Sequence, residues 1–496
     1  MPRPRPKTHN IPATTGLDPA NWAELRAQGH RMLDDMLDYL EGIRERPVWQ
    51  PIPSAVRRGF DAPLPAAPSA LAEIHDAFMR DILPFSSGNA HPGFMGWVQG
   101  GGNPVGMLAE MLAAGLNANC GGRDHMPIEV ERQILRWVRA LFQFPEGASG
   151  LFVTGTSMAN FIGVVVARTA ALGPGIRRTG IASDGRRLTA YTSRAAHGCV
   201  AQAMELSGLG SDALRQIPTN EADQIDVAAL REAILRDRAA GFFPFLIVGT
   251  AGTVDIGAID DLTALADLAA EQALWLHIDG AYGALGILAP DIAPRLAGIE
   301  CADSLAFDFH KWGQVPYDAG FILVRDGELH RRAFAAPASY LRRDTRGLSA
   351  GSPWPCDFGP DLSRGFRALK TWFTLKAHGL EQIGAVVSET CALARLLARR
   401  IEETPELELL APVALNIVCF RYRGADSDRI NAEIVVALQE SGIVAPSTTT
   451  VEGRLAIRAA IVNHRTGAAD IEALLEATLA FGRAVAMTSV TEIASS

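Results

Sequence analysis

The sequence predicts an α/β fold in which a large, mainly parallel sheet carries helices on both faces. Two observations predict the sheet: short apolar runs typical of buried parallel strands recur through the middle of the chain, and segments with helical spacing of apolar residues separate them. A third concerns residues 415–486, where strand, helix, strand and helix alternate. We therefore expect an N-terminal helical segment, a large sheet domain and a small C-terminal α+β domain.

Composition limits the class of protein. The 496 residues are 48 % hydrophobic and 20 % charged, which suits one sizeable domain with one or two smaller ones. A formal charge of −9, without a basic run interleaved with aromatics, argues against nucleic acid or an anionic membrane surface as partner. No apolar segment reaches the roughly 18 residues of a membrane helix. The six cysteines stand singly without CxxC spacing, so we expect no metal site, reduced thiols and a cytoplasmic location.

The first predicted helix, Asn21 to Arg44, carries an apolar stripe. The stripe consists of Leu25, Met32, Leu33, Met36, Leu37 and Leu40. The following stretch, Pro47 to Pro68, holds several prolines and cannot form one regular element. Such a helix has little of its own chain to pack on nearby, so we infer that it packs on another subunit; packing within the chain remains the alternative.

The first predicted strand of the large sheet, Leu151 to Val153, leads through the small polar turn Thr154 to Ser157 into a helix at Met158 to Ala171. A helix N-terminus presents unpaired N–H groups and the hydroxyls add donors, so this arrangement suits a phosphate group. An ordinary Thr or Ser helix cap is the alternative, because many helices begin this way.

Two later strands follow the same scheme. Leu188 to Ser193 leads to His197 at the start of a helix, and a histidine just past a strand's carboxyl end lies where open α/β sheets bind ligands. Phe245 to Thr250 is a second buried strand. A structural histidine is the alternative reading of His197.

Two further apolar runs end in residues that a protein core would not choose. Trp275 to Ile278 ends in Asp279, and Ser304 to Phe307 leads to Lys311. This pair suits a pyridoxal phosphate enzyme, in which the lysine forms a Schiff base and the aspartate keeps the pyridine nitrogen protonated. An amine can exchange its imine for the substrate's, whereas arginine cannot. An ion pair that caps the strands is the alternative for either residue alone, and the two together favour the cofactor.

The motifs HIDGAYG at 277–283 and DSLAFDFHKW at 303–312 make the sequence similar to the group II pyridoxal-phosphate-dependent amino acid decarboxylases, the relatives of aromatic-L-amino-acid decarboxylase. The resemblance runs from about Trp22 to about Arg483. It implies pyridoxal 5'-phosphate as cofactor, the fold type I, aspartate-aminotransferase-like architecture, and a homodimer embraced by the N-terminal segment. The expected divisions are a helical arm at 1–95, a cofactor-binding domain at 96–385 and a small domain at 386–496.

The resemblance assigns cofactor contacts to matching residues. It implies that the phosphate lies at Gly155, Thr156 and Ser157. It also implies that His197 stacks on the pyridine ring near the substrate carboxylate. The remaining expected cofactor contacts are Thr253, Asp279, Ala281, Asp308, His310 and Lys311. Asp308 departs from the asparagine of animal relatives, and because a carboxylate repels phosphate we expect it to turn to another donor.

Candidate substrate contacts come from two loops. In the family the loop from His91 to Gly106 forms part of the wall of the substrate pocket, which makes Phe94 and Trp97 candidate substrate contacts. The alternative, to which we give equal weight, is that these aromatic side chains only pack the loop in place. The polar run Asn119 to His125 departs from its more apolar relatives, and Arg123 or His125 could pair with a substrate side-chain carboxylate.

A long segment from Arg342 to Asp361 mixes glycines and prolines with charged residues, and such loops are typically functional. Tyr340, just before it, matches the family tyrosine that returns a proton to Cα after carbon dioxide leaves, at the neighbouring subunit's site. Relatives with phenylalanine there tend to form aldehydes by consuming oxygen. An ordinary loop aromatic is the alternative.

The resemblance and the residues together predict decarboxylation of an aromatic L-amino acid (tryptophan, tyrosine, phenylalanine or Dopa type) to the primary amine and carbon dioxide. The expected catalytic residues are Lys311, His197, Tyr340 and Asp279. The alternatives are a decarboxylase of an acidic amino acid, an aldehyde-forming oxidase, an aminotransferase, a C–C lyase and a non-catalytic binding protein with the same fold.

Overall fold

The computed structural model describes residues 16–335, 343–424 and 426–495, which form two compact units. The first unit comprises the chain up to Ile43 together with Ile52–Ser86, and the second comprises Arg44–Pro51 and the residues from Ser87 onward. The three-part division at residues 95 and 385 stays a prediction. No helix in the described ranges is long and apolar enough to cross a membrane.

The first unit is helical, as the apolar stripe predicts. Its elements are α1 (Trp22–Glu41), α2 (Ser54–Gly59), α3 (Leu71–Ala77), the π-helical turn η2 (Phe78–Ile82) and the 3₁₀ turn η3 (Leu83–Phe85). Asn21 caps α1, because its Oδ1 accepts the N–H groups of Ala23 and Glu24 at 3.0 and 3.3 Å. Arg31 of α1 forms an ion pair of 2.6 Å with Asp76 of α3. No residue of α1 is fully buried: in the apolar stripe Leu25, Met32 and Leu37 are exposed, and the other three side chains are half-buried.

The second unit contains a seven-stranded sheet with the order β2-β8-β7-β6-β5-β3-β4. The strands are β2 (Ser149–Val153), β3 (Leu188–Ser193), β4 (Leu214–Ile217), β5 (Phe243–Thr250), β6 (Trp275–Asp279), β7 (Ser304–Asp308) and β8 (Gly320–Val324). β8 runs antiparallel to both of its neighbours, and the other pairs are parallel. The predicted α/β class with a mainly parallel sheet is confirmed.

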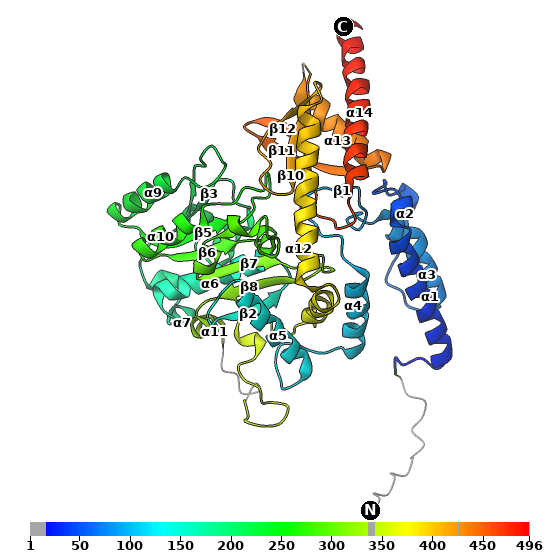
Figure 1. Cartoon of the computed structure of the whole chain (residues 1–496). Helices are drawn as coiled ribbons and strands as arrows, with labels where there is room; N and C mark the ends of the chain where they lie inside the picture. The colour runs from blue at the N-terminus through cyan, green and yellow to red at the C-terminus, as the bar shows by residue number, and fades with distance from the viewer. Residues whose placement is uncertain (1–15, 336–342, 425, 496) are drawn as a thin grey trace, which may run out of the picture. The chain divides into compact units, whose positions relative to one another are not determined.

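Helices cover both faces of this sheet (Figure 1). They are α5 (Met126–Leu141), α6 (Thr156–Leu172), α8 (Cys199–Leu206), α9 (Val227–Ala239), α10 (Leu262–Gln272) and α11 (Gly327–Phe334), with the short α7 (Ile176–Thr179). Alternate side chains of β5 show the two faces: Ile247 packs in one apolar cluster with α9 and α10, whereas Leu246 and Val248 pack in another with α6 and α8.

The carboxyl ends of the parallel strands meet at one edge. Thr250 at the end of β5 pairs with Asp279 at the end of β6, and Asp279 pairs with Ala306 near the end of β7. Val153 of β2 and Asp308 of β7 both pair with Gly320, so β2 ends at the same edge. Open α/β sheets bind ligands at this edge, and the fold gathers the predicted site residues there.

A second sheet of five strands, with the order β1-β11-β12-β10-β9, forms the C-terminal part. Its elements are β1 (Phe94–Met95), β9 (Leu407–Leu409), β10 (Ile417–Tyr422), β11 (Ala445–Val451), β12 (Arg454–Ala460), α13 (Ser427–Ser441) and α14 (Ala468–Ser495). Two helices connect it with the large sheet: α4 (Pro104–Leu116) and the long α12 (Arg367–Glu402), which runs beside both sheets (Figure 1). α12 breaks at Gly379, which has φ 71°.

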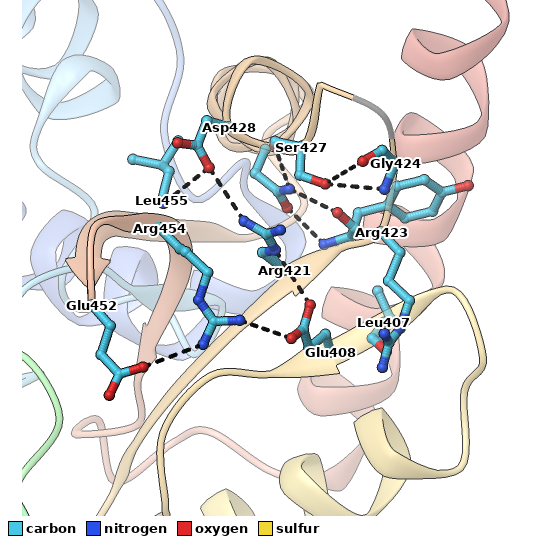
Figure 2. Close-up of polar contacts among 12 residues, drawn as sticks. Leu407, Glu408, Arg421, Arg423, Gly424, Ser427, Asp428, Glu452, Arg454 and Leu455 are labelled. Atoms are coloured by element: carbon cyan, nitrogen blue, oxygen red, sulfur yellow. Dashed lines mark hydrogen bonds and ion pairs between the residues drawn. The ribbon is translucent and has the colours of Figure 1, made fainter.

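The rim of the small sheet carries a group of ion pairs (Figure 2). Arg421 of β10 and Arg454 of β12 both reach Glu408 of β9, at 3.4 and 2.9 Å. Arg421 also contacts Asp428 of α13 at 3.3 Å. These side chains are partly exposed, so each pair contributes roughly 0–1 kcal/mol to the stability of the fold.

Candidate active site

A cavity of about 380 Å³ opens at the carboxyl edge of the large sheet. Strand ends supply Thr250, Asp279 and Asp308, and the turn after β2 supplies residues 154–157. Its other lining residues are Trp97, Val98, Gln99, His197, Cys199, Gly252, Val254, Ala281, Tyr282, His310, Lys311 and Tyr317. The cavity therefore brings together most of the residues that the sequence predicts for the cofactor.

The turn after β2 forms one end of the cavity. Gly155, Thr156 and Ser157 all line it, and helix α6 begins at Thr156. Thr156 Oγ1 is buried and has no hydrogen-bond partner among the described residues. A Cβ added at Gly155 would lie 3.6 Å from His310 Cε1, an ordinary van der Waals distance, so the turn lies directly beside His310. A helix N-terminus beside a hydroxyl that no other described group bonds is suited to bind an anion.

Asp279 lies at the end of β6 and is 3 % exposed. Its Oδ2 accepts Asn160 Nδ2 at 2.9 Å, and its Oδ1 accepts the N–H of Ala281 at 3.1 Å. Burial raises the pKa of this carboxyl, while the charge of Lys311 and the two hydrogen bonds lower it. A buried carboxylate with two donors is suited to hold a proton on a basic ring nitrogen.

Lys311 faces the cavity next to Asp308. Its Nζ lies 2.9 Å from Asp308 Oδ2, and His310 Nε2 lies 3.6 Å from the same oxygen. Asp308 therefore turns to Lys311 as its donor, while Asp308 Oδ1 is buried without a hydrogen-bond partner among the described residues. His310 Nδ1 accepts the N–H of Ala319 at 2.9 Å, and burial lowers the pKa of His310. Lys311 thus enters the cavity beside a carboxylate and a neutral imidazole.

His197 lines the cavity from the segment after β3. Its Nδ1 accepts the N–H of Cys199 at 3.1 Å, so the neutral ring carries its proton on Nε2. Burial raises the pKa of the Cys199 thiol to about 12, which keeps this cavity thiol protonated.

Thr253, predicted as a cofactor contact, does not line the cavity. Its Oγ1 accepts the N–H of Ala258 at 3.0 Å inside its own loop. Thr250, three residues earlier, does line the cavity, and its Oγ1 is buried without a hydrogen-bond partner among the described residues. The geometry favours Thr250 as the hydroxyl that faces the cavity; the signal for it in the sequence is its place at the end of a buried strand.

Of the four predicted substrate contacts, Trp97 lines the cavity and the others lie elsewhere in the described chain. Phe94 is buried in β1, with its ring centroid 6.2 Å from that of Trp97. The Arg123 guanidinium lies over the ring of Trp354 at 4.6 Å. His125 Nε2 bonds to backbone carbonyls of its own loop. Tyr340, the predicted proton donor, lies outside the described residues.

Comparison with known proteins gives the family. The model of the pyridoxal-dependent decarboxylase conserved domain matches residues 53–423, well over half of the chain. The chain belongs to the pyridoxal-dependent decarboxylase family. Its members are enzymes that remove carbon dioxide from amino acids with pyridoxal 5'-phosphate as cofactor, and this decarboxylase is one of them.

Individual relatives differ in their substrates. The decarboxylase is 32 % identical over 457 residues to an aromatic-L-amino-acid decarboxylase of Bacillus atrophaeus, covering 89 % of this chain and 92 % of that one. It is 30 % identical over 421 residues to an L-2,4-diaminobutyrate decarboxylase of Rhizobium meliloti, covering 84 % and 83 %. A crystal structure of Oryza sativa TDC with PLP and tryptamine matches with a TM-score of 0.86 at 24 % identity, covering 95 % and 100 %, which shows the same fold.

The residues of the cavity fit pyridoxal phosphate. The unpaired Thr156 hydroxyl and the open helix N-terminus suit its phosphate, and the Asp279 carboxylate suits its ring nitrogen. Lysine occurs in the decarboxylase at positions 7, 311, 370 and 376 alone. Lys370 is buried against Glu110 at 3.1 Å, and Lys376 is exposed on α12, so Lys311 is the lysine that lines the cavity among the described residues.

Gly320→Ala is expected to weaken pyridoxal phosphate binding. A Cβ at this position would lie 2.4 Å from the Cα of Gly155, a backbone atom that cannot turn aside. The turn that begins α6 would have to shift, and overpacking of this kind costs about 1–3 kcal/mol. Thermal unfolding and titration of the apoprotein with pyridoxal phosphate measure the two effects.

The matched control is Gly175→Ala, because Gly175 has φ −61° and no atom lies within 4 Å of its added Cβ. It should leave both quantities unchanged. Wild-type affinity for the cofactor in Gly320→Ala would show that the turn tolerates the displacement and would contradict the role given to it.

Proposed function

We propose that the decarboxylase converts an aromatic L-amino acid to its primary amine and carbon dioxide. The observation that carries this proposal is the apolar and aromatic wall of the cavity, which includes Trp97, Val98, Val254 and Tyr317. An aromatic substrate side chain would pack against such a wall through apolar contact and offset or edge-to-face ring contacts.

The charges of the cavity support the same class of substrate. Among the described lining residues, the carboxylates and the ammonium belong to Asp279, Asp308 and Lys311, and the proposed cofactor contacts use all three. An acidic side chain would need a cation, yet Arg123 and His125 do not line the cavity. The proposal therefore favours an uncharged aromatic side chain over an acidic one.

The proposed roles follow from the positions of the side chains. Bound pyridoxal phosphate supplies a sink for the electron pair left at Cα when carbon dioxide departs. Lys311 would hold the cofactor covalently and yield its place to the substrate amine. Asp279 would keep a proton on the ring nitrogen, and Thr156 with the first N–H groups of α6 would bind the phosphate. His197 would stack on the ring and present Nε2–H to the substrate carboxylate.

A screen against all common L-amino acids and L-2,4-diaminobutyrate tests the function. The purified, cofactor-loaded protein is incubated with each one, and carbon dioxide, amine and hydrogen peroxide are quantified in each well. Equal amounts of amine and carbon dioxide from an aromatic substrate are expected. Turnover of glutamate, aspartate or diaminobutyrate in preference to every aromatic substrate would overturn the proposed substrate class.

The product depends on Tyr340 in this proposal, since the resemblance makes it the acid that protonates Cα. Tyr340→Phe removes the phenolic proton, so the main product should change from amine to aldehyde. Ammonia should then be released and oxygen consumed. Liquid chromatography of the products with an oxygen electrode measures the change. An unchanged yield of amine would remove Tyr340 as the proton donor.

We propose further that the decarboxylase acts as a homodimer. Three apolar side chains of α4 are exposed in the single chain: Met111, Leu112 and Leu116, at 54, 46 and 62 %. Exposed apolar groups clustered on one helix mark an interaction surface. Sedimentation velocity should show a dimer for the wild type, and Leu116→Arg should raise the dissociation constant of the dimer at least about tenfold because it places a charge in the interface.

The control variant is Leu235→Arg, which changes a similarly exposed leucine on α9. It should sediment as the wild type does. A fully active wild-type monomer would contradict the proposed dimer.

A further inference from the structure

A chain of side-chain hydrogen bonds extends from Asp279 into the protein interior. Asn160 Nδ2 donates to Asp279 Oδ2 at 2.9 Å, and Asn160 Oδ1 lies 2.8 Å from His277 Nε2. His277 Nδ1 lies 2.8 Å from Ser304 Oγ, which also accepts Trp275 Nε1 at 2.8 Å. We call these four residues behind Asp279 the relay. They come from α6, β6 and β7, so the relay joins the helix to the two central strands.

Three of the four relay residues are buried from water, and Trp275 at the far end is half-buried. Asn160 is 1 % exposed, and both His277 and Ser304 are 0 % exposed. Burial lowers the pKa of His277 to about 3, so its ring is neutral and carries one proton. A Cβ at Gly163 of α6 would lie 2.7 Å from the ring, so the glycine gives the imidazole its place against the helix. A neutral, buried imidazole must donate at one nitrogen and accept at the other.

Both ends of the relay fix the direction of its hydrogen bonds. An indole N–H can only donate, so Trp275 donates to Ser304; an ionised carboxylate can only accept, so Asn160 donates to Asp279 and offers its Oδ1 to His277 Nε2–H, which leaves His277 Nδ1 to accept the Ser304 hydroxyl proton. His277 consequently donates through Nε2 to Asn160 Oδ1, which leaves the amide N–H groups for Asp279 and for Cys199 Sγ at 3.1 Å. Every bond of the relay thus points its proton toward the carboxylate.

A protonated Asp279 would break this order. If its carboxyl donated to Asn160, the amide would have to turn and present N–H groups to His277 Nε2. His277 would then need its proton on Nδ1, and Ser304 Oγ would receive two donors, with its own proton left without a partner in the relay. Each lost or misdirected bond in a buried site is costly, so the relay favours the ionised carboxylate against the opposing effect of burial.

We propose that Asn160 and His277 are positioning residues that hold Asp279 ionised and directed at the cavity, and so set how strongly the site binds a protonated pyridine ring. This proposal rests on the role proposed above for Asp279. Neither residue lines the cavity, and neither would touch the substrate. The expected consequence is a preference for ligands that carry a basic ring nitrogen.

The test compares two ligands of the apoprotein: pyridoxal phosphate and its 1-deaza analogue, in which a CH group replaces the ring nitrogen. The wild type should bind pyridoxal phosphate more tightly. His277→Phe removes both hydrogen bonds of the imidazole, and the dissociation constant for pyridoxal phosphate should rise about tenfold while that for the analogue stays unchanged. No turnover is measured, so failure of the proposed substrate class does not affect the result.

The protein offers a matched control in His330. It is 0 % exposed, burial lowers its pKa to about 3, and its Nδ1 lies 2.8 Å from Ser149 Oγ, as His277 Nδ1 does from Ser304. His330 belongs to α11 and does not line the cavity. His330→Phe should lower the melting temperature and leave the ratio of the two dissociation constants as in the wild type.

Two further variants keep the test decisive. The ratio compared is the dissociation constant of the 1-deaza analogue divided by that of pyridoxal phosphate, and it should fall in His277→Phe. His277→Gln retains a donor toward Asn160 and should restore part of this ratio. If His277→Phe does not fold, Ser304→Ala removes a single hydroxyl and should lower the ratio about threefold. An unchanged ratio in His277→Phe or Ser304→Ala would overturn the proposal, and equal binding of both ligands by the wild type would overturn the role of Asp279 on which it rests.

Discussion

Lys311→Ala is expected to abolish both turnover and the imine absorbance of the bound cofactor. Lys311 is the lysine of the cavity, and the other described lysines lie elsewhere. The variant loses the covalent attachment of the cofactor and also the Lys311 amine near the substrate Cα. Each such contribution is worth about 10²–10⁴-fold, so kcat should fall by at least about 10³-fold. Product formation by mass spectrometry and absorbance of the loaded protein near roughly 420 nm measure the two effects.

Borohydride makes the attachment permanent and locates it. Reduction of the loaded wild type followed by peptide mapping should find the cofactor on Lys311. Lys376→Ala, which changes an exposed lysine of α12, should retain activity, absorbance and the labelled peptide. A label on Lys370, or a yellow and active Lys311→Ala protein, would refute the assignment.

The buried strands were predictable because their apolar runs end at clear boundaries. The strand predicted at Leu188–Ser193 has the bounds of β3 in the structure. β11 (Ala445–Val451) was missed, since it contains a proline and three threonines and gains its strand character from pairing with β12. Strands that depend on a partner carry a weak pattern of their own.

The site was predictable where a polar residue interrupts an apolar run. Asp279 and Lys311 stand out for this reason, and the structure brings both to one cavity. Asn160 was missed because a single amide in a helix reads as an ordinary polar residue. Only the packing of α6 on β6 brings it to 2.9 Å from Asp279. Contacts between elements distant in sequence are invisible to local patterns.

The predicted substrate contacts fared differently for a similar reason. Trp97 reaches the cavity from a loop, whereas Arg123 turns to the ring of Trp354, a residue more than 200 positions away in the chain. The loop sequence alone gives no sign of this contact, because the aromatic partner belongs to another segment. Loop side chains follow their tertiary neighbours, and their direction cannot be derived from spacing.

Asp279→Asn is expected to lower kcat about 10²–10³-fold with the cofactor still bound, which is the usual cost of removing one preorganised electrostatic partner. Asparagine keeps the size of the side chain and can still accept the N–H of Ala281, but it has no charge with which to hold a proton on the ring nitrogen. Its amide group also meets the Asn160 amide, so one of the two must turn. Steady-state kinetics at saturating pyridoxal phosphate, with absorbance to confirm loading, measure the loss.

The control for this variant lies near the opposite end of β6. Asp303 accepts the N–H of Leu276 at 2.8 Å, and burial raises the pKa of its carboxyl, as it does for Asp279, yet Asp303 does not line the cavity. Asp303→Asn should therefore lower the melting temperature and leave kcat within about twofold of the wild type, because surface and strand-end changes act on stability and not on the reacting atoms. If Asp279→Asn were as active as Asp303→Asn, the electron sink would not depend on a carboxylate at the end of β6, and the proposed role of Asp279 would be wrong.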